Sequence, residues 1–266
     1  MVPQPIRQLK AVKAVRQILR RVVPQPIRKL EIETCSTCNR TCLGCIRNSH
    51  PNRARVQDWF APNFMPTEMV EKILTEAQEM GFRGTVCLQH YNEPLMDERI
   101  GRFGKFAREL GFREVLMATN ADYMTEERAA ELDGVFTRLL IALYMDEPKK
   151  SEREKWLRSV FSKTELLFTG GGHIPTHFSP VFDVKGLAQA HLDRPCSLPL
   201  ERMILNHRGD MLLCCDDVVG NFDLGNVRTH SLRELWYGKK HQQILKDLLV
   251  AGGRRKHPYC SSCPRP

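Results

Sequence analysis

The chain has 266 residues, long enough for one large domain or for a large and a small one. Hydrophobic residues make up 42% of it, enough for a packed core, yet no apolar run reaches the roughly 18 residues that would span a membrane. The formal net charge is +9, and many of the ten cysteines lie in short clusters. Because no secretory signal is visible, we expect a cytoplasmic protein whose reduced cysteines bind metal.

The basic excess is concentrated in residues 1–29, which carry eight Lys and Arg side chains and no acidic one. Apolar residues recur there at helical spacing, between the near-repeats VPQPIRQL and VPQPIRKL. We predict a basic amphipathic N-terminal helix over 1–29, packed on the main domain with its basic face in water. Docking of an anionic partner is the alternative, and we expect no nucleic-acid partner. A transit peptide fits less well, because the second copy runs straight into a strand.

Strand-like and helix-like segments alternate from residue 29 to residue 171. Strands are predicted at 29–35, 84–90, 113–120, 137–146 and 164–171. Helices are predicted at 67–80 (capped by Thr67), 97–111 (closed by Gly111), 125–132 and 151–161. This order predicts an α/β fold in which residues 30–185 form a partial (β/α) barrel of about five to six parallel strands. Ligands of such barrels collect at the C-terminal ends of the strands.

The pattern changes after residue 185, and residues 186–266 are expected to form a small, separate C-terminal iron–sulfur domain. A hairpin is predicted over 202–215, turning at residues 207–210, and a helix over roughly 231–246. The cysteines of this region are Cys196, Cys214, Cys215, Cys260 and Cys263. The region is short for a hydrophobic core of its own, so metal ligation would supply stability that burial cannot.

Four further cysteines lie in the segment ETCSTCNRTCLGC, at positions 35, 38, 42 and 45. Zinc held by two Cys-x2-Cys pairs fits the count, but the two pairs are much closer together than in usual structural zinc sites. A 4Fe–4S cluster held by all four thiols fits the spacing better. So does a cluster held by Cys38, Cys42 and Cys45, with one iron left open.

The spacing Cys-x3-Cys-x2-Cys after a strand resembles the signature of the radical S-adenosylmethionine (SAM) superfamily. The segment LQHYNEPLMDERI is similar to the family's second-strand motif, and MATNA to its third-strand Thr-Asn-Gly. In the tail, Cys196-x12-Gly209-x4-Cys214 and Cys260-x2-Cys263 resemble the C-terminal SPASM or twitch extension. The resemblance covers about residues 30 to 266.

The resemblance implies two 4Fe–4S clusters and S-adenosyl-L-methionine as cofactors. It gives Cys38, Cys42 and Cys45 to a cluster whose open iron binds SAM, and it gives a saturated auxiliary cluster to Cys196, Cys214, Cys260 and Cys263. The implied cofactor-binding residues are Asn92, Glu93, Thr119, Asn120 and Asp146. Cys35 and Cys215 are left outside both clusters, Cys35 as a small residue of the barrel and Cys215 because adjacent strand residues face opposite sides.

In the family, one electron cleaves SAM to methionine and a 5′-deoxyadenosyl radical, which abstracts a hydrogen atom from the substrate. The electron would come from a reducing partner such as flavodoxin or ferredoxin. The tail matches the short twitch version, as in the dehydrogenase that oxidises 2-deoxy-scyllo-inosamine. We therefore expect a two-electron oxidation of a small polar substrate, with the auxiliary cluster as electron acceptor. A peptide-modifying maturase or a sugar epimerase of the same superfamily is the alternative, and a non-enzymatic zinc or electron-transfer protein is a further one.

The residues that act on the substrate are the least defined. An alcohol oxidation needs a base after hydrogen abstraction. Tyr91, His173 and His177 lie near predicted strand ends and are the catalytic residues that we expect. A barrel-closing turn explains the segment TGGGHIPTH equally well. The chain departs from the family pattern at Tyr91 and Asn92, where the family has two glycines.

Overall fold

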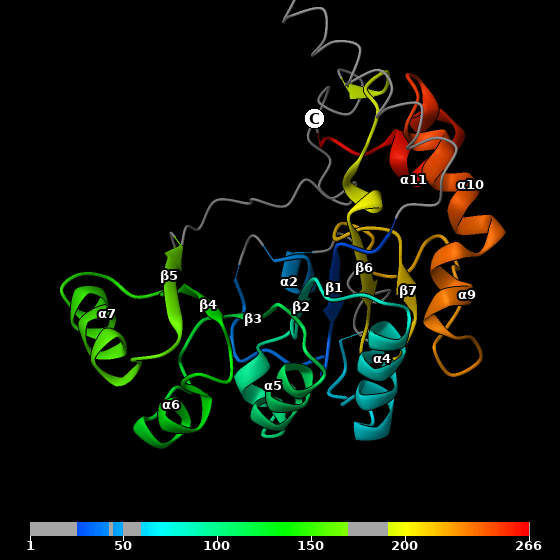
Figure 1. Ribbon diagram of the computed structural model, residues 1–266. Helices are drawn as coiled ribbons and strands as arrows, with labels where there is room; N and C mark the ends of the chain where they lie inside the picture. The colour runs from blue at the N-terminus through cyan, green and yellow to red at the C-terminus, as the bar shows by residue number, and fades with distance from the viewer. Residues whose placement is uncertain (1–25, 43–44, 50–59, 170–190, 266) are drawn as a thin grey trace, which may run out of the picture.

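The computed structural model describes residues 26–42, 45–49, 60–169 and 191–265. One sheet runs through the molecule in the order β5-β4-β3-β2-β1-β6-β7 (Figure 1). Its strands are β1 (Lys29–Ile32), β2 (Thr85–Cys87), β3 (Glu114–Thr119), β4 (Arg138–Ala142), β5 (Glu165–Thr169), β6 (Arg202–Leu205) and β7 (Met211–Leu212). Neighbours are parallel from β5 across to β6, and only β7 is antiparallel to its partner. The expected α/β partial barrel of about five to six parallel strands is confirmed.

The alternation of side chains along the first strand explains the two faces of the sheet. In β1, Leu30 and Ile32 are fully buried in the main hydrophobic core, while the intervening Lys29 and Glu31 point to the other face and pair with each other at 2.9 Å. Residues in register lie on the same side of a sheet, so this polar face of β1 continues onto the same face of the neighbouring strands. One apolar face therefore packs on helices, and the opposite face carries polar groups toward the interior of the partial barrel.

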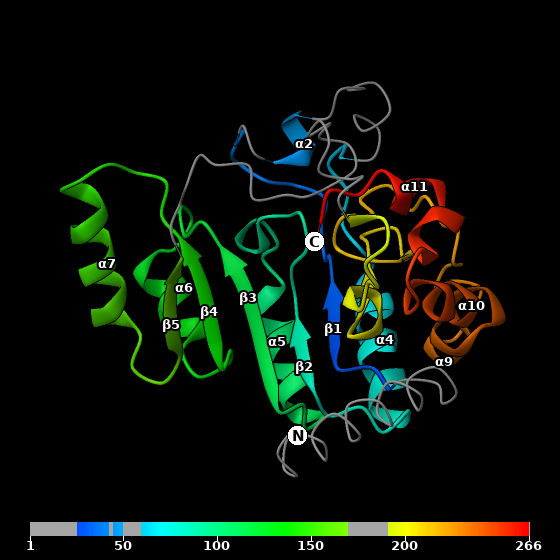
Figure 2. The same cartoon turned by 90° about the horizontal axis from the view of Figure 1, so that it is seen from above.

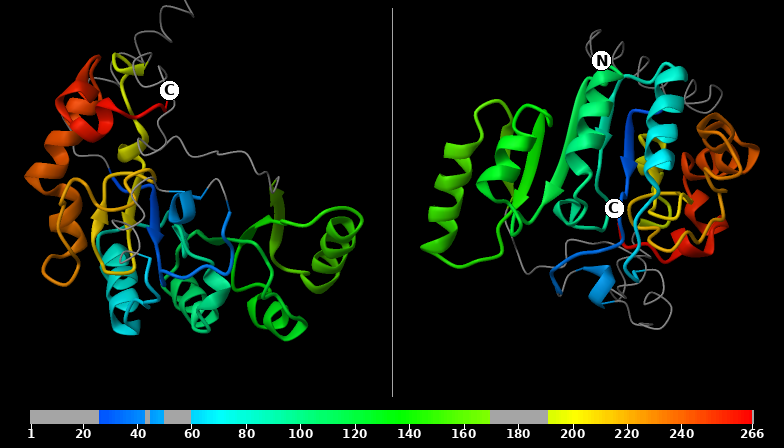
Figure 3. Two further views of the ribbon diagram at one scale, coloured as in Figure 1. Left: turned by 180° about the vertical axis from the view of Figure 1, so that it is seen from behind. Right: turned by 90° about the horizontal axis from the view of Figure 1, so that it is seen from below.

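The apolar face is covered by helices that follow the strands in sequence (Figures 2 and 3). They are α4 (Thr67–Glu79), α5 (Ile100–Glu109) and α6 (Glu126–Leu132), while α7 (Lys149–Val160) lies beside the edge strand β5. Gly111, just after α5, has φ +81°, as expected for a glycine that ends a helix. The cap expected at Thr67 is wrong by one residue, because Pro66 is the N-cap of α4 and the Thr67 hydroxyl accepts from Arg99 instead.

The predicted hairpin is present as β6 and β7, but it joins the main sheet. Leu30 of β1 is in register with Met203 of β6, so this hairpin does not stand apart from the barrel. The single helix expected over 231–246 is two helices, α9 (Leu232–Tyr237) and α10 (Lys239–Leu248). They separate at Gly238, whose ψ of 143° is not helical and where a Cβ would lie 2.5 Å from the Glu234 carbonyl oxygen.

Short elements carry the segments in which functional residues were predicted. They are α2 (Ile46–Ser49), η1 (Pro94–Met96), η2 (Leu198–Leu200), η3 (Gly253–Lys256) and α11 (Pro258–Ser261). The N-terminal helix predicted over 1–29 lies almost wholly outside the described residues, as do His173 and His177. The domain boundaries at 29/30 and 185/186 remain predictions. No helix of the described residues is long and apolar enough to cross a membrane.

Candidate functional site

The loops after the first four strands meet at the carboxyl end of the sheet. The strand arrows of β1 to β4 point toward α2, and the end of the described chain lies on the same side (Figure 2). The cysteine loop leaves β1 after Ile32, and the loops after β2 and β3 carry Glu93 and Asn120. The arrangement therefore collects most of the predicted site residues at the edge where parallel α/β folds bind ligands.

The three cysteines of the predicted radical cluster lie close to one another. The Cys45 amide donates to the Cys42 carbonyl at 3.1 Å, in the turn that enters α2. Burial raises the pKa of Cys45 to about 11, and the thiols of Cys38 and Cys42 raise it further. The guanidinium of Arg47 acts in the opposite direction on both Cys38 and Cys45. Three partly buried thiols beside one cation form a donor set that suits an iron–sulfur cluster.

Glu93 ties the three loops together. Its carboxylate accepts hydrogen bonds from the Thr119 hydroxyl at 2.6 Å, the Asn120 amide at 2.8 Å and the Leu95 amide at 3.1 Å. Its own amide donates to the carbonyl of Thr37 in the cysteine loop at 2.8 Å. Burial raises the pKa of Glu93, although the bonds from Thr119 and Asn120 oppose the rise. Within the described residues, Glu93 therefore already holds the three loops together through hydrogen bonds.

Cys35 is fully buried and faces this network rather than the other cysteines. Its sulfur lies 3.5 Å from both the Asn92 amide nitrogen and the Thr37 hydroxyl. Burial, the largest effect, raises its pKa. The Asn92 amide oxygen accepts from the His90 amide at 3.0 Å, so Asn92 links Cys35 to the loop after β2. These contacts fit the expectation that Cys35 is a small packing residue.

The four thiols predicted for the auxiliary cluster surround one cavity. Its wall includes Cys196, Cys214, Cys260 and Cys263, together with apolar side chains such as Leu213 and Leu248. The amide of Cys263 donates to the Cys260 carbonyl at 3.2 Å, so the turn after α11 presents both sulfurs to the same space. Among the described residues no three His, Cys, Asp or Glu side chains meet at single-ion spacing. Four thiols around an apolar space fit an iron–sulfur cluster.

Cys215, which follows Cys214, does not line that cavity. Its sulfur lies 3.9 Å from Nη2 of Arg265, and its carbonyl oxygen accepts the Tyr91 hydroxyl at 2.6 Å. Burial raises the pKa of Tyr91 well above its ordinary value, and Cys45 and Cys215 both add to the rise. Tyr91 therefore stays protonated at neutral pH and lies between the two cysteine sites. This environment makes it a poor proton acceptor, although it had been expected among the catalytic residues.

A buried histidine next to Tyr91 was missed by the sequence analysis. His90 lies with Nδ1 3.5 Å from Oε2 of Glu31, and its side chain is 5% exposed. Its Nε2 has no hydrogen-bond partner among the described residues. The pKa of Glu31 is lowered to about 2, since the bonds from His90 and Lys29 outweigh burial, which acts in the other direction. The Glu31 carboxylate thus fixes the orientation of the imidazole, and Nε2 is the ring nitrogen that faces away from that carboxylate.

The remaining predicted residue, Asp146, is solvent-exposed beyond the end of β4. Its carbonyl accepts the Lys150 amide at 3.1 Å, while the N-cap of α7 is Pro148. Asn92, Glu93, Thr119 and Asn120 by contrast converge, and Asn120 also bonds Asn39 of the cysteine loop at 2.8 Å. Three of the five predicted cofactor-binding residues, Glu93, Thr119 and Asn120, therefore form one hydrogen-bonded group, while the Asn92 side chain bonds Cys35 and the His90 amide.

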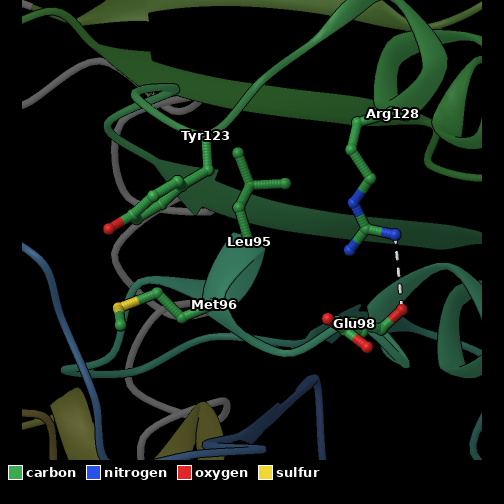
Figure 4. A pocket seen from close by; sticks show the side chains of 5 residues that line it. All are labelled: Leu95, Met96, Glu98, Tyr123 and Arg128. Carbon is green, nitrogen blue, oxygen red and sulfur yellow. Dashed lines mark hydrogen bonds between the residues drawn. The ribbon is translucent and has the colours of Figure 1, made fainter.

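A shallow cavity of about 610 Å³ lies beside η1, whose residues Leu95 and Met96 form part of its wall (Figure 4). Its lining residues are Leu95, Met96, Glu98, Tyr123 and Arg128. The Arg128 guanidinium is already committed to the carbonyls of Asp97 and Glu98 and to the Glu131 carboxylate. The cavity contains no cysteine and no predicted site residue, and we assign no function to it.

Comparison with known families agrees with this geometry. The family described as the Radical SAM superfamily matches residues 32–181, and the iron–sulfur cluster-binding domain described as SPASM matches residues 196–264. The chain belongs to the radical SAM superfamily. It is thus a SAM-binding enzyme with a radical SAM 4Fe–4S cluster, and its C-terminal region carries an auxiliary iron–sulfur cluster.

Its relatives within that superfamily are distant. The chain is 22% identical to the S-adenosyl-L-methionine-dependent 2-deoxy-scyllo-inosamine dehydrogenase of Niallia circulans, over 88% of this chain and 91% of that protein. The crystal structure of BtrN in complex with AdoMet and 2-DOIA is similar with a TM-score of 0.72 at 17% identity, covering 91% of this chain and 95% of BtrN. SuiB of Streptococcus suis, bound to S-adenosylmethionine, has a TM-score of 0.52 at 14% identity, covering 98% of this chain and 82% of SuiB. At these identities the structural likeness concerns the fold.

Proposed function

We propose that this protein uses a 5′-deoxyadenosyl radical to oxidise an alcohol of a small polar substrate by two electrons. The observation that carries the proposal is the cavity walled by Cys196, Cys214, Cys260 and Cys263. Four thiols saturate one 4Fe–4S cluster, so the substrate cannot bind its iron, and the cluster can only exchange electrons. The printed activity of the Niallia circulans relative, a dehydrogenase, supports the same reaction class.

The radical site is assigned to Cys38, Cys42 and Cys45. When bound there, the cluster supplies the electron that cleaves SAM. The protein's own part is to hold the three thiols in one loop and to brace that loop through bonds from Glu93 to Thr37 and from Asn120 to Asn39. We assign the electron supply to a small reducing partner such as flavodoxin or ferredoxin. The Tyr91 hydroxyl donates to the carbonyl of Cys215, the residue after Cys214, and so ties the loop after β2 to the C-terminal region.

We assign the proton of the substrate hydroxyl to His90. In the balanced reaction, the carbon-bound hydrogen atom passes to the 5′-deoxyadenosyl radical and the hydroxyl proton passes to Nε2 of His90. The remaining electron would go to a cluster held by Cys196, Cys214, Cys260 and Cys263, and the product would be a ketone. The geometry that supports His90 is its contact with Glu31 and its buried Nε2, which has no hydrogen-bond partner in the part of the chain that the structure describes.

The oxidation can be tested by replacing Cys260 and Cys263 with Ala in the anaerobically reconstituted protein. Iron content should fall by about half, while dithionite-driven release of 5′-deoxyadenosine continues, because the three-cysteine site is separate. Ketone formation from 2-deoxy-scyllo-inosamine and a panel of polyols and amino sugars should be lost. Circular dichroism must show a folded tail, since metal and folding are coupled there. Oxidation at the wild-type rate by a folded variant would refute the proposal and favour a redox-neutral reaction such as epimerisation.

The role of His90 can be separated from hydrogen abstraction. For His90→Gln we expect ketone formation to fall by roughly 10²–10⁴-fold, the usual contribution of a general base. Transfer of deuterium from labelled substrate into 5′-deoxyadenosine should persist, because that step does not use His90. If the variant forms ketone normally with an unchanged pH profile, another group accepts the proton.

A further inference from the structure

Arg254 is a buried cation on the wall of the four-cysteine cavity. It belongs to η3, is 2% exposed and ranks among the largest fully buried side chains of the described residues. Gly252, with φ +73°, and Gly253, where a Cβ would lie 1.7 Å from the Asp247 carbonyl oxygen, form the turn that places it. The close approach of the backbone at this turn leaves room only for glycine at 253.

The guanidinium of Arg254 is only partly satisfied. Nη1 donates to the Arg265 carbonyl at 2.5 Å, whereas Nε and Nη2 have no hydrogen-bond partner among the described residues. Its neighbours differ: Arg255 pairs with Asp193 at 3.0 Å, and Arg265 pairs with Asp216 at 2.7 Å. Two donors of Arg254 are therefore buried with no acceptor, beside thiols that could carry negative charge.

The thiols nearest to this cation are those of the cavity. Arg254 lines this cavity together with Cys196, Cys214, Cys260 and Cys263. The thiolate is the form of cysteine that binds iron, so four ligating sulfurs would place negative charge beside the guanidinium.

A buried charge without a partner is strongly unfavourable, and a buried donor without an acceptor costs free energy as well. A cluster held by four thiolates supplies what Arg254 lacks, namely negative charge and sulfur acceptors. Hydrogen bonds to the sulfurs and the net charge nearby are among the factors that set the reduction potential of an iron–sulfur cluster. A cation at this position favours the reduced form, which carries one more negative charge.

We propose that Arg254 is the counter-charge and hydrogen-bond donor of the auxiliary cluster, and that it raises the reduction potential of that cluster so that it accepts an electron from the substrate radical. The inference rests on the proposed electron-acceptor role but is measured without substrate. Under this proposal Arg254 contacts no substrate, and it acts only through the cluster.

The test compares Arg254→Gln with Arg255→Gln, the exposed and ion-paired neighbour. Both changes are made in the full chain with Cys38, Cys42 and Cys45 replaced by Ala, so that the auxiliary cluster gives the only iron–sulfur signal. Potentials are measured by a redox titration followed by electron paramagnetic resonance. We expect Arg254→Gln to keep its iron and to shift the reduction equilibrium at least tenfold toward the oxidised form, about 59 mV for one electron. Arg255→Gln should match the parent.

An unchanged potential in an iron-replete Arg254→Gln variant would overturn the inference. If Arg254→Gln fails to hold iron, the Arg254→Lys variant tests whether the charge alone is sufficient, because lysine keeps the charge but lacks the planar donors. Retained iron with a potential near that of the parent supports the role of the charge, and loss of iron in both variants shows a purely structural role and overturns the inference. Failure of the proposed function is distinct, because it appears as continued substrate oxidation after Cys260 and Cys263 are removed.

Discussion

Glu93→Gln tests the point where the three loops of the site meet. The carboxylate accepts from Thr119, Leu95 and Asn120 at 2.6, 3.1 and 2.8 Å, with the first two on one oxygen and Asn120 on the other. Glutamine has a single acceptor oxygen, so at least one buried N–H must face the new NH2 group. Leaving one buried donor without an acceptor costs about 1–3 kcal/mol.

A second effect opposes this loss. Burial raises the pKa of Glu93 in spite of its hydrogen bonds, which means that the ionised carboxylate is disfavoured at this position. A neutral amide avoids part of that desolvation cost. We therefore expect a net destabilisation of about 1–2 kcal/mol, and a melting temperature lower by about 2–8 °C for a chain of this size.

The measurement is thermal unfolding of the reconstituted protein, with iron content and SAM binding by equilibrium dialysis recorded on the same samples. The control is Glu98→Gln, the same substitution at an exposed glutamate five residues further along the chain. Iron should be retained and SAM binding weakened, as the superfamily resemblance implies for this carboxylate. A melting temperature indistinguishable from that of the control would refute the hydrogen-bond argument, and loss of iron would show that Glu93 is needed to hold the cluster.

Three further predictions concern single side chains. Cys42→Ala should abolish release of 5′-deoxyadenosine by dithionite-reduced protein, whereas Cys35→Ser should leave it largely intact; the reverse result would show that the cluster uses a different set of thiols. The folded pKa of Glu31, about 2, lies below its ordinary 4.5, so its carboxylate stabilises the fold above pH 4.5. That contribution, about 3 kcal/mol, is lost as the pH falls from 4.5 toward 2, and denaturant unfolding of Glu31→Gln should lack this part of the acid dependence. Tyr91→Phe removes the bond to the Cys215 carbonyl and should lower the free energy of unfolding by about 1 kcal/mol, and an unchanged value would mean that water replaces the bond.

The sequence alone determined the local elements, and it predicts which thiols bind the clusters. Alternation of Leu30 and Ile32 with polar residues specifies a strand with one buried face, and Gly111 specifies the end of a helix, because these signals depend on neighbouring residues only. The spacing of Cys38, Cys42 and Cys45 likewise defines a compact loop whatever surrounds it. The break at Gly238 was missed because a single glycine does not reveal by itself whether a helix stops there.

Only the tertiary structure decided which distant segments meet. The pairing of β1 with β6 joins residues about 170 positions apart, and no local pattern specifies which free edge of a sheet a later hairpin will occupy. The same pairing brings Arg202 within 3.0 Å of Glu31, and the neighbouring loop brings His90 to that carboxylate. In the sequence, Arg254 is one of several basic residues near the end of the chain. Its burial beside Cys260 follows from a turn packed against α10. Burial and hydrogen-bond partners are properties of the packed chain, and they are the reason that we propose chemical roles for His90 and Arg254.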